Sequence, residues 1–139
     1  MRILDTTITI GAPPEAIWAV LTDFARYEEW NPFIRRGEGE AVNGSTLTLD
    51  IEPPGELRRT HRPVVLAAEP GRRLVWLGRI PVLLAGRHEF VLEPDGAGTR
   101  LRQREEMRGL LVPFLRRVLD HTEDGFVAMN HALKRRVEG

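Results

Sequence analysis

His88 and Glu105 are the side chains of this sequence best suited to exchange protons with a bound molecule. They lie on either side of an Asp-Gly-Ala-Gly sequence at 95–98, which is typical of a tight turn between two strands. If Pro94 faces Thr99 across that turn, antiparallel pairing places His88 directly opposite Glu105. A neighbouring carboxylate orients an imidazole and favours its charged form, whereas burial opposes the charge. The spacing therefore predicts a candidate catalytic acid/base pair.

The same register predicts where this pair points. Alternate side chains of a strand share one face, so His88 and Glu105 lie on a face with Gln103 and with the apolar residues Phe90, Leu92, Leu101 and Met107. This face is expected to point inward. A second interpretation is that the two residues are a satisfied polar pair that only completes the wall of the sheet. A bulge in the turn would move them out of register.

Other chemistries find little support in the sequence. The absence of cysteine excludes disulfides, thiolate ligands and a cysteine nucleophile. His121 and His131 are about 80° from a common helix face and so do not form a helical ligand pair; we expect neither a metal nor any cofactor. Ser45, the only serine, follows a turn, and no Gly-rich loop precedes a helix, which disfavours serine hydrolases and nucleotide enzymes. The pattern around His61 does not indicate the face to which it points.

The composition favours one domain that spans residues 1–139, of which 42% are apolar. Twenty basic residues balance twenty acidic ones, so we expect no nucleic-acid or other partner that is selected by bulk charge. No stretch approaches the ~20 apolar residues of a membrane span, and the first residues lack the apolar region of a signal peptide. We therefore expect a cytoplasmic protein.

The elements that would position the pair follow from the periodicity of apolar residues. Residues 2–10 alternate like a strand, and Pro13 and Pro14 open a short helix, followed by a second helical piece that ends before Pro32. Six further strands are expected at 33–41, 45–52, 57–69, 72–80, 85–94 and 98–108. A helical stripe then predicts a long helix over 110–137, in which Gly125 suggests a close approach or a bend. The fold class is α+β, with a curved seven-stranded antiparallel sheet.

Several sequence stretches match one known fold family. They are Pro14-Glu15-Ala16-Ile17-Trp18, Leu21-Thr22-Asp23-Phe24, the residues from Tyr27 to Phe33, Leu74-Val75-Trp76, Gly86 to Phe90, Gly98-Thr99-Arg100, Glu105 with Gly109, and Gly125 to Lys134. In these stretches the chain resembles the START-like (SRPBCC) superfamily, and within it the bacterial polyketide cyclase/dehydrase-like branch. The resemblance implies a helix-grip fold in which the long C-terminal helix closes the sheet over a deep apolar cavity.

Such a cavity would take a hydrophobic small molecule. The side chains expected to line it are Trp30, Phe33, Trp76, His88, Phe90, Gln103, Glu105, Phe114, Phe126 and Met129. Ordinary core packing explains the aromatic and methionine side chains of this set equally well.

Three functions are open at this point. The leading hypothesis is a carrier or sensor of a lipid, acyl or aromatic molecule, without catalysis. The second is a cyclase or dehydratase that uses His88 and Glu105 as acid and base. The third is a protein-interaction module, as in co-chaperone relatives. It would use the apolar segment 80–85, which is otherwise expected to be a cavity lid, a homodimer contact or a buried strand start.

Overall fold

The computed structural model describes residues 1–139 and shows eight strands, two α-helices and two short 3-10 helices in the expected order. Their bounds are β1 Arg2–Ile10, α1 Pro14–Leu21, η1 Phe24–Glu29, β2 Ile34–Glu38, β3 Thr48–Ile51, β4 Arg59–His61, β5 Val64–Glu69, β6 Arg73–Ile80, β7 Leu84–Asp95, β8 Gly98–Arg108, η2 Val112–Phe114 and α2 Arg116–Glu138. No helix is both long enough and apolar enough to cross a membrane.

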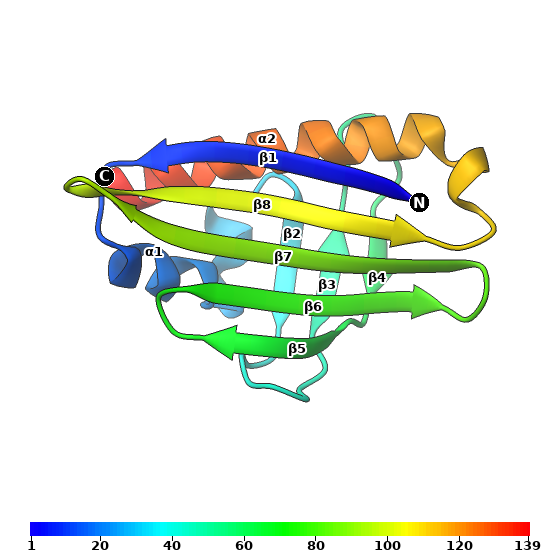
Figure 1. Ribbon diagram of the computed structural model, residues 1–139, viewed down its shortest axis with the longest axis horizontal. Helices are drawn as coiled ribbons and strands as arrows, with labels where there is room; N and C mark the ends of the chain where they lie inside the picture. The colour runs from blue at the N-terminus through cyan, green and yellow to red at the C-terminus, as the bar shows by residue number, and fades with distance from the viewer.

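The strands form two antiparallel sheets that face each other. The larger sheet has the order β1-β8-β7-β6-β5, and the smaller one the order β2-β3-β4. Figure 1 shows the smaller sheet behind the larger one, with its strands running across those in front. The segment around Thr46 bridges to Val64 on β5, so the chain bends continuously from one sheet to the other.

The expected strand count of seven was therefore wrong by one. The predicted strand 57–69 is broken into β4 and β5 at Arg62 and Pro63. Proline has no backbone N–H to give to a ladder, so pairing is interrupted where the chain passes between the sheets. The break creates the strong curvature that a single long strand would have resisted.

Helix α2 lies against the same side of the larger sheet, behind β1 and β8 (Figure 1). It buries the predicted apolar stripe, including Phe126, Met129 and Leu133. Of the two reasons predicted for Gly125, a close approach is confirmed. A Cβ at this position would lie 2.3 Å from Cδ1 of Phe33. The next residue, Phe126, packs edge to face against the same Phe33 ring, with ring centroids 5.6 Å apart.

The start of the long helix was predicted too early. Residues 110–115 are not α-helical, and they contain the short 3-10 helix η2 with Pro113 in its first turn. Phe114 consequently projects from the end of the molecule and is 82% exposed, so it does not line the interior.

Candidate functional site

The hairpin of β7 and β8 has the predicted register. Pro94 pairs with Thr99, and six residues further back His88 pairs with Glu105. Both side chains point to the inner face, and His88 Nδ1 lies 2.7 Å from Glu105 Oε2. Because the Asp-Gly-Ala-Gly turn contains no bulge, the alternation of side chains is preserved along the whole hairpin.

Aromatic rings surround the imidazole of His88, which is only 3% exposed. Trp76, its cross-strand neighbour on β6, stacks on it with ring centroids 4.9 Å apart and planes 17° from parallel. The ring centroids of Phe90 and Phe126 lie 4.7 and 4.9 Å from that of His88. Three aromatic rings therefore enclose the imidazole.

A chain of buried amide and hydroxyl groups continues from His88 to the helix. His88 Nε2 contacts Gln103 Oε1 at 3.1 Å, and Gln103 Nε2 donates to Asn130 Oδ1 on α2 at 2.7 Å. Asn130 Nδ2 donates to Thr6 Oγ1 on β1 at 2.9 Å, and the Thr6 hydroxyl donates to the backbone carbonyl of Gln103 at 2.9 Å. The network joins two strands and the helix in a closed loop of hydrogen bonds.

The direction of these hydrogen bonds fixes one proton of His88. Thr6 has a single hydroxyl proton and gives it to a carbonyl, so it must accept from the Asn130 amide nitrogen. Asn130 then presents its oxygen to Gln103, whose amide nitrogen also faces the carbonyl of Phe126 at 3.4 Å. Gln103 therefore turns its own oxygen toward His88, and His88 Nε2 must carry a proton.

The second ring nitrogen shares a proton with the carboxylate. With Nε2 already protonated, the 2.7 Å contact between Nδ1 and Glu105 holds one further proton, as an imidazolium–carboxylate pair or as a neutral imidazole with a carboxylic acid. Nε2 is occupied by Gln103 and faces the protein. Any proton exchange with a bound molecule must therefore run through Glu105.

Glu105 is the accessible end of the network. Its side chain is 16% exposed, and Oε1 has no hydrogen-bond partner in the protein. Beside it lies a pair of glycines, Gly78 and Gly86, which face each other across β6 and β7. A Cβ at Gly86 would lie 3.1 Å from Glu105 Oε1, whereas a Cβ at Gly78 would find only Pro63 within 4 Å, at 3.8 Å. At Gly86 the place of a side chain is already taken by Glu105 and by Met107, whose Sδ would lie 3.0 Å from a Cβ there, so the recess beside the free oxygen is the space for a side chain at Gly78.

His61 lies near this recess. It pairs with the buried Leu49, which places its side chain on the inner side of the smaller sheet, and it is exposed. Partial desolvation lowers the pKa of His61, and the charge of Glu105 acts in the opposite direction. The sequence pattern could not indicate this orientation because both parities of the predicted strand carry apolar residues.

The remaining predicted lining residues are placed as follows. Phe33, Trp76, Phe90, Phe126 and Met129 lie in the main core, between the sheets and α2. Trp30 is partly buried at the edge of this core, with its ring centroid 5.2 Å from that of Tyr27. Only Phe114 is displaced, to the surface.

The interior between the sheet and α2 is closed rather than open as the resemblance implied. Phe90, Gln103, Phe126 and Met129 each have no exposed surface, which leaves no space of the size of a water molecule beside them. Two polar hollows lie outside, one of them on the outer face of the larger sheet and lined by Asp5, Thr7, Val91, Glu93, Arg100 and Arg102. A ligand can therefore reach these four side chains only if their neighbours move.

His121, one of the two histidines on α2, has a structural contact. His121 contacts Glu56 at 2.6 Å, which attaches the start of α2 to the loop before β4. No group of three or more histidine, aspartate or glutamate side chains gathers in a form that could hold a metal ion.

Comparison with known proteins identifies relatives across the whole chain. A sequence model of the family described as polyketide cyclase / dehydrase and lipid transport matches residues 1–138. Protein MLL2253 from Mesorhizobium loti has a similar structure, with a TM-score of 0.80, 23% identity and coverage of 99% of this chain and 97% of that one. No curated protein matches the sequence.

Two further solved structures carry informative descriptions. The Zhui aromatase/cyclase from Streptomyces sp. R1128 has a TM-score of 0.79 and 22% identity, over 99% of this chain and 93% of that one. A START superfamily protein from Mycobacterium smegmatis has a TM-score of 0.76 and 21% identity, over 99% and 98%. At these identities the likeness establishes the fold.

Proposed function

This chain belongs to the polyketide cyclase / dehydrase and lipid transport family and has a START-like helix-grip fold. On this basis we propose that it is a carrier or sensor that binds an apolar small molecule between the larger sheet and α2. The observation that carries this proposal is the free Oε1 of Glu105, which is the one acceptor of the buried network left without a protein partner. A partly exposed acceptor of this kind, at the end of a buried network, fixes the orientation of a ligand whose remaining surface is apolar.

The chemistry of the recess supports a ligand that carries a hydroxyl or another hydrogen-bond donor. Such a donor would contact Glu105 Oε1 over the Gly78–Gly86 pair, and the apolar body would lie along the inner face toward Met107. Met107 belongs to a small second core with Val112 and Leu119, separate from the main core. Moving these few side chains costs less burial than opening the twenty-residue main core.

The test is a screen of hydroxylated fatty acids, sterols and aromatic polyketides by native mass spectrometry and thermal denaturation. A ligand at one hundred times its Kd should stabilise the fold by about 2.7 kcal/mol and raise the Tm. Substitution Glu105→Gln should weaken binding about tenfold or more, because a charge-assisted hydrogen bond is lost. Glu106→Gln is the matched control, since Glu106 is the next residue, lies on the outer face and pairs with Arg104 at 3.3 Å.

Two outcomes would contradict this proposal. One is the absence of any bound or stabilising molecule across the three classes. The other is a ligand whose affinity falls equally in Glu105→Gln and Glu106→Gln.

The contact between His88 and Glu105 supports a second candidate, a cyclase or dehydratase. In that case Glu105 would be the catalytic residue that gives and takes the proton, and His88 a positioning residue that holds the shared proton from behind. An enzyme predicts that Glu105→Gln lowers turnover by about a hundredfold or more while ligand affinity changes little, and that His88→Asn alters the pH profile of kcat. A carrier predicts the reverse: affinity falls, and no turnover of any bound polyketide is detected in the unmodified protein.

A further inference from the structure

Two connections far apart in the sequence form one end of the molecule. The loop between β6 and β7 and the connection from β8 to α2 lie side by side, joined by backbone hydrogen bonds from Leu110 to Val82 at 3.4 Å and from Leu111 to Leu83 at 3.0 Å. Gly109 makes this approach possible: it has φ +125°, and a Cβ there would lie 2.3 Å from the carbonyl oxygen of Leu83. Figure 1 shows both connections at the same end of the larger sheet.

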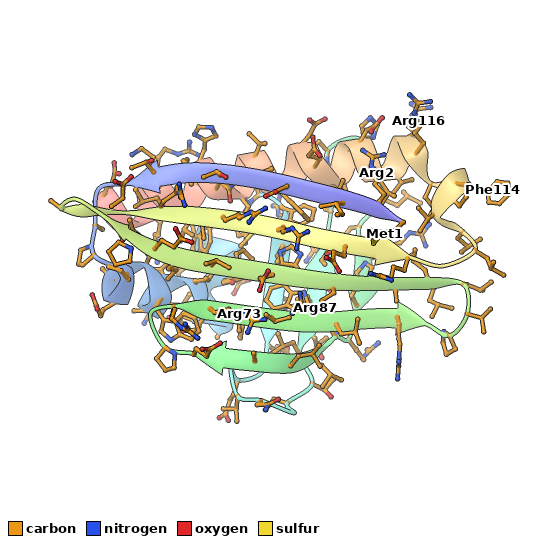
Figure 2. All side chains as sticks on the ribbon, viewed as in Figure 1. Met1, Arg2, Arg73, Arg87, Phe114 and Arg116 are labelled. Atoms are coloured by element: carbon orange, nitrogen blue, oxygen red, sulfur yellow. The ribbon has the colours of Figure 1, made fainter.

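This end exposes large apolar side chains. We define the apolar tip as Ile80, Val82, Leu83, Leu110 and Phe114, whose exposed fractions run from 41% to 82%. Figure 2 shows Phe114 projecting away from the body of the protein. Val82 is held at φ +68°, a conformation that β-branched residues rarely adopt, so the loop presents its side chain outward at a cost in backbone strain. Clustered apolar exposure of this kind indicates a surface that another phase or molecule covers.

The charged side chains within the two connections are all basic. Residues 78–86 and 107–119 contain four arginines, Arg79, Arg108, Arg116 and Arg117, and no aspartate or glutamate. All four side chains are exposed, and none has a carboxylate within 4.0 Å. At the opposite end of the molecule, around α1 and the β7–β8 turn, Glu15 and Asp95 are exposed and unpaired acids.

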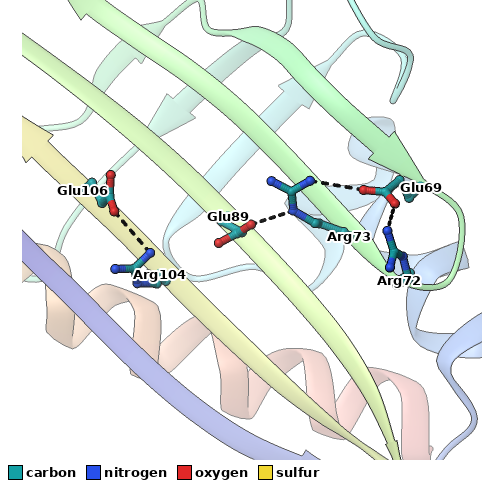
Figure 3. Close-up of polar contacts among 6 residues, drawn as sticks. All are labelled: Glu69, Arg72, Arg73, Glu89, Arg104 and Glu106. Carbon is teal, nitrogen blue, oxygen red and sulfur yellow. Dashed lines mark hydrogen bonds and ion pairs between the residues drawn. The ribbon is translucent and has the colours of Figure 1, made fainter.

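Most arginines elsewhere on the larger sheet are paired with carboxylates, Arg87 on β7 being the exception. Figure 3 shows Arg73 between Glu69 and Glu89, at 3.2 and 2.7 Å, and Arg104 on Glu106 at 3.3 Å. The balanced net charge of the chain therefore conceals a local group of four unpaired arginines beside the exposed apolar residues, whereas the unpaired arginines elsewhere, such as Arg35, Arg59 and Arg135, are not next to such a patch. A molecule with this distribution is oriented by a negative surface.

We propose that the apolar tip docks on an anionic lipid bilayer, with its side chains in the interfacial region and the four arginines on lipid phosphates. The tip is formed by side chains that protrude from two neighbouring loops, which suits insertion between lipid headgroups. Each basic residue near such a surface adds attraction, and arginine binds phosphate through a planar fork of donors. A second copy of this chain fits less well, because a symmetric contact would bring the unpaired arginines of both copies together.

The apolar tip lies next to the proposed ligand site. Directly behind it lies the small core of Met107, Val112 and Leu119, and Met107 Sδ would be 3.0 Å from a Cβ at Gly86, which borders Glu105. Docking would place the movable side of the proposed ligand site against the lipid phase. This last step rests on the proposed function, whereas the docking itself does not.

The experiment is cosedimentation of the full chain with vesicles of phosphatidylcholine alone and of phosphatidylcholine mixed with phosphatidylglycerol, at low and high salt. We expect binding to the mixed vesicles only, weakened by salt. Arg79→Gln and Arg116→Gln should each reduce affinity about fivefold, the loss of one basic contact. Phe114→Ser should reduce it about tenfold, because an inserted aromatic ring is lost.

Matched controls separate docking from general charge and from unfolding. Arg59→Gln removes an exposed, unpaired arginine from β4, and Leu57→Ser removes a 74% exposed leucine from a loop before it. Both should leave binding unchanged, and thermal denaturation should show all variants folded. Equal loss in the controls, no binding to mixed vesicles at low salt, or a dimer that Phe114→Ser dissociates would each overturn the proposal. So would selective capture of an acidic protein without vesicle binding.

Discussion

Gln103 is uncharged, yet it determines the protonation of the histidine that it contacts at 3.1 Å. Its amide is held by acceptors on one side, so only its oxygen is left for His88 Nε2. The residue that looked like the proton donor in the sequence is thereby turned away from any ligand. In either proposed function, the atom that meets the ligand is an oxygen of Glu105 rather than a nitrogen of the imidazole.

Gln103→Met should lower the free energy of unfolding, because it removes the central amide of this network. The change leaves His88 Nε2–H without its acceptor and Asn130 without its donor, both in the core, so unfolding should become easier by about 2–4 kcal/mol. Nitrogen NMR of the unmodified protein should find a proton on Nε2 of His88, whereas the Gln103→Met variant should lose the preference for this nitrogen.

Arg102→Met is the control for the adjacent position on the outer face. The Arg102–Asp5 pair is exposed, so its loss should cost at most about 1 kcal/mol. Observation in the unmodified protein of a His88 tautomer with a bare Nε2 would contradict the assigned direction of the hydrogen bonds.

Part of this site could be read from the sequence and part could not. His88 and Glu105 were found because a four-residue turn fixes the register of everything in its hairpin. Asn130 and Thr6 were missed: their contacts join residues 27 and 124 positions apart, and no local pattern encodes them. An asparagine within the apolar stripe of a helix was the one available signal, since a buried amide requires partners.

Among the elements, α2 approaches Phe33 closely at Gly125. A helix interior normally gains about 1 kcal/mol when glycine becomes alanine. Here the added Cβ would lie 2.3 Å from the Phe33 ring, far inside contact distance. Packing therefore outweighs propensity at this position.

Gly125→Ala should consequently destabilise the protein by about 1–2 kcal/mol, measured by urea denaturation, since overpacking of a filled core costs about 1–3 kcal/mol. Adding Phe33→Leu should recover part of the loss, which makes the double variant less damaged than the sum of the two. Asp124→Ala, at the exposed neighbouring position, should change stability by less than about 0.5 kcal/mol. A more stable Gly125→Ala variant would mean that Phe33 moves freely.

The elements themselves were predicted where periodicity is strong and misjudged where proline intervenes. Strands β1 and β8 and the body of α2 follow their apolar patterns. Pro63 divides one predicted strand, and Pro113 accompanies the delay of α2 until Arg116. In both places the missing N–H or fixed φ of proline redirects the chain although apolar residues continue on either side.

At the scale of the whole molecule, α2 is fastened at its far end by a carboxylate. Glu138 Oε2 accepts hydrogen bonds from the backbone N–H of Gly11 at 2.7 Å and from Lys134 Nζ at 2.6 Å. The Lys134 ammonium, followed by the Gly11 amide, lowers the pKa of Glu138 below 4.5. The last turn of the chain is thus joined to the end of β1.

A lowered folded-state pKa makes this contribution depend on pH in one direction. It is fully present above the unfolded value near 4.5 and disappears as the pH falls through the lower folded value. Glu138→Gln should therefore reduce the urea midpoint at neutral pH, and the difference from the unmodified protein should shrink in acid. Glu40→Gln, at an exposed and unpaired glutamate, should show no such pH-dependent difference; an equal effect in both variants would contradict the assignment.

The glycine pair beside Glu105 also offers a position for a fluorescent label. Gly78 has room for a side chain, with only Pro63 nearby, and the chain contains no cysteine. Gly78→Cys would therefore supply a single thiol at the edge of the recess, to which an environment-sensitive dye can be attached without competing sites. Such a labelled protein would turn the arrival of any ligand, or of a lipid surface, into an optical signal.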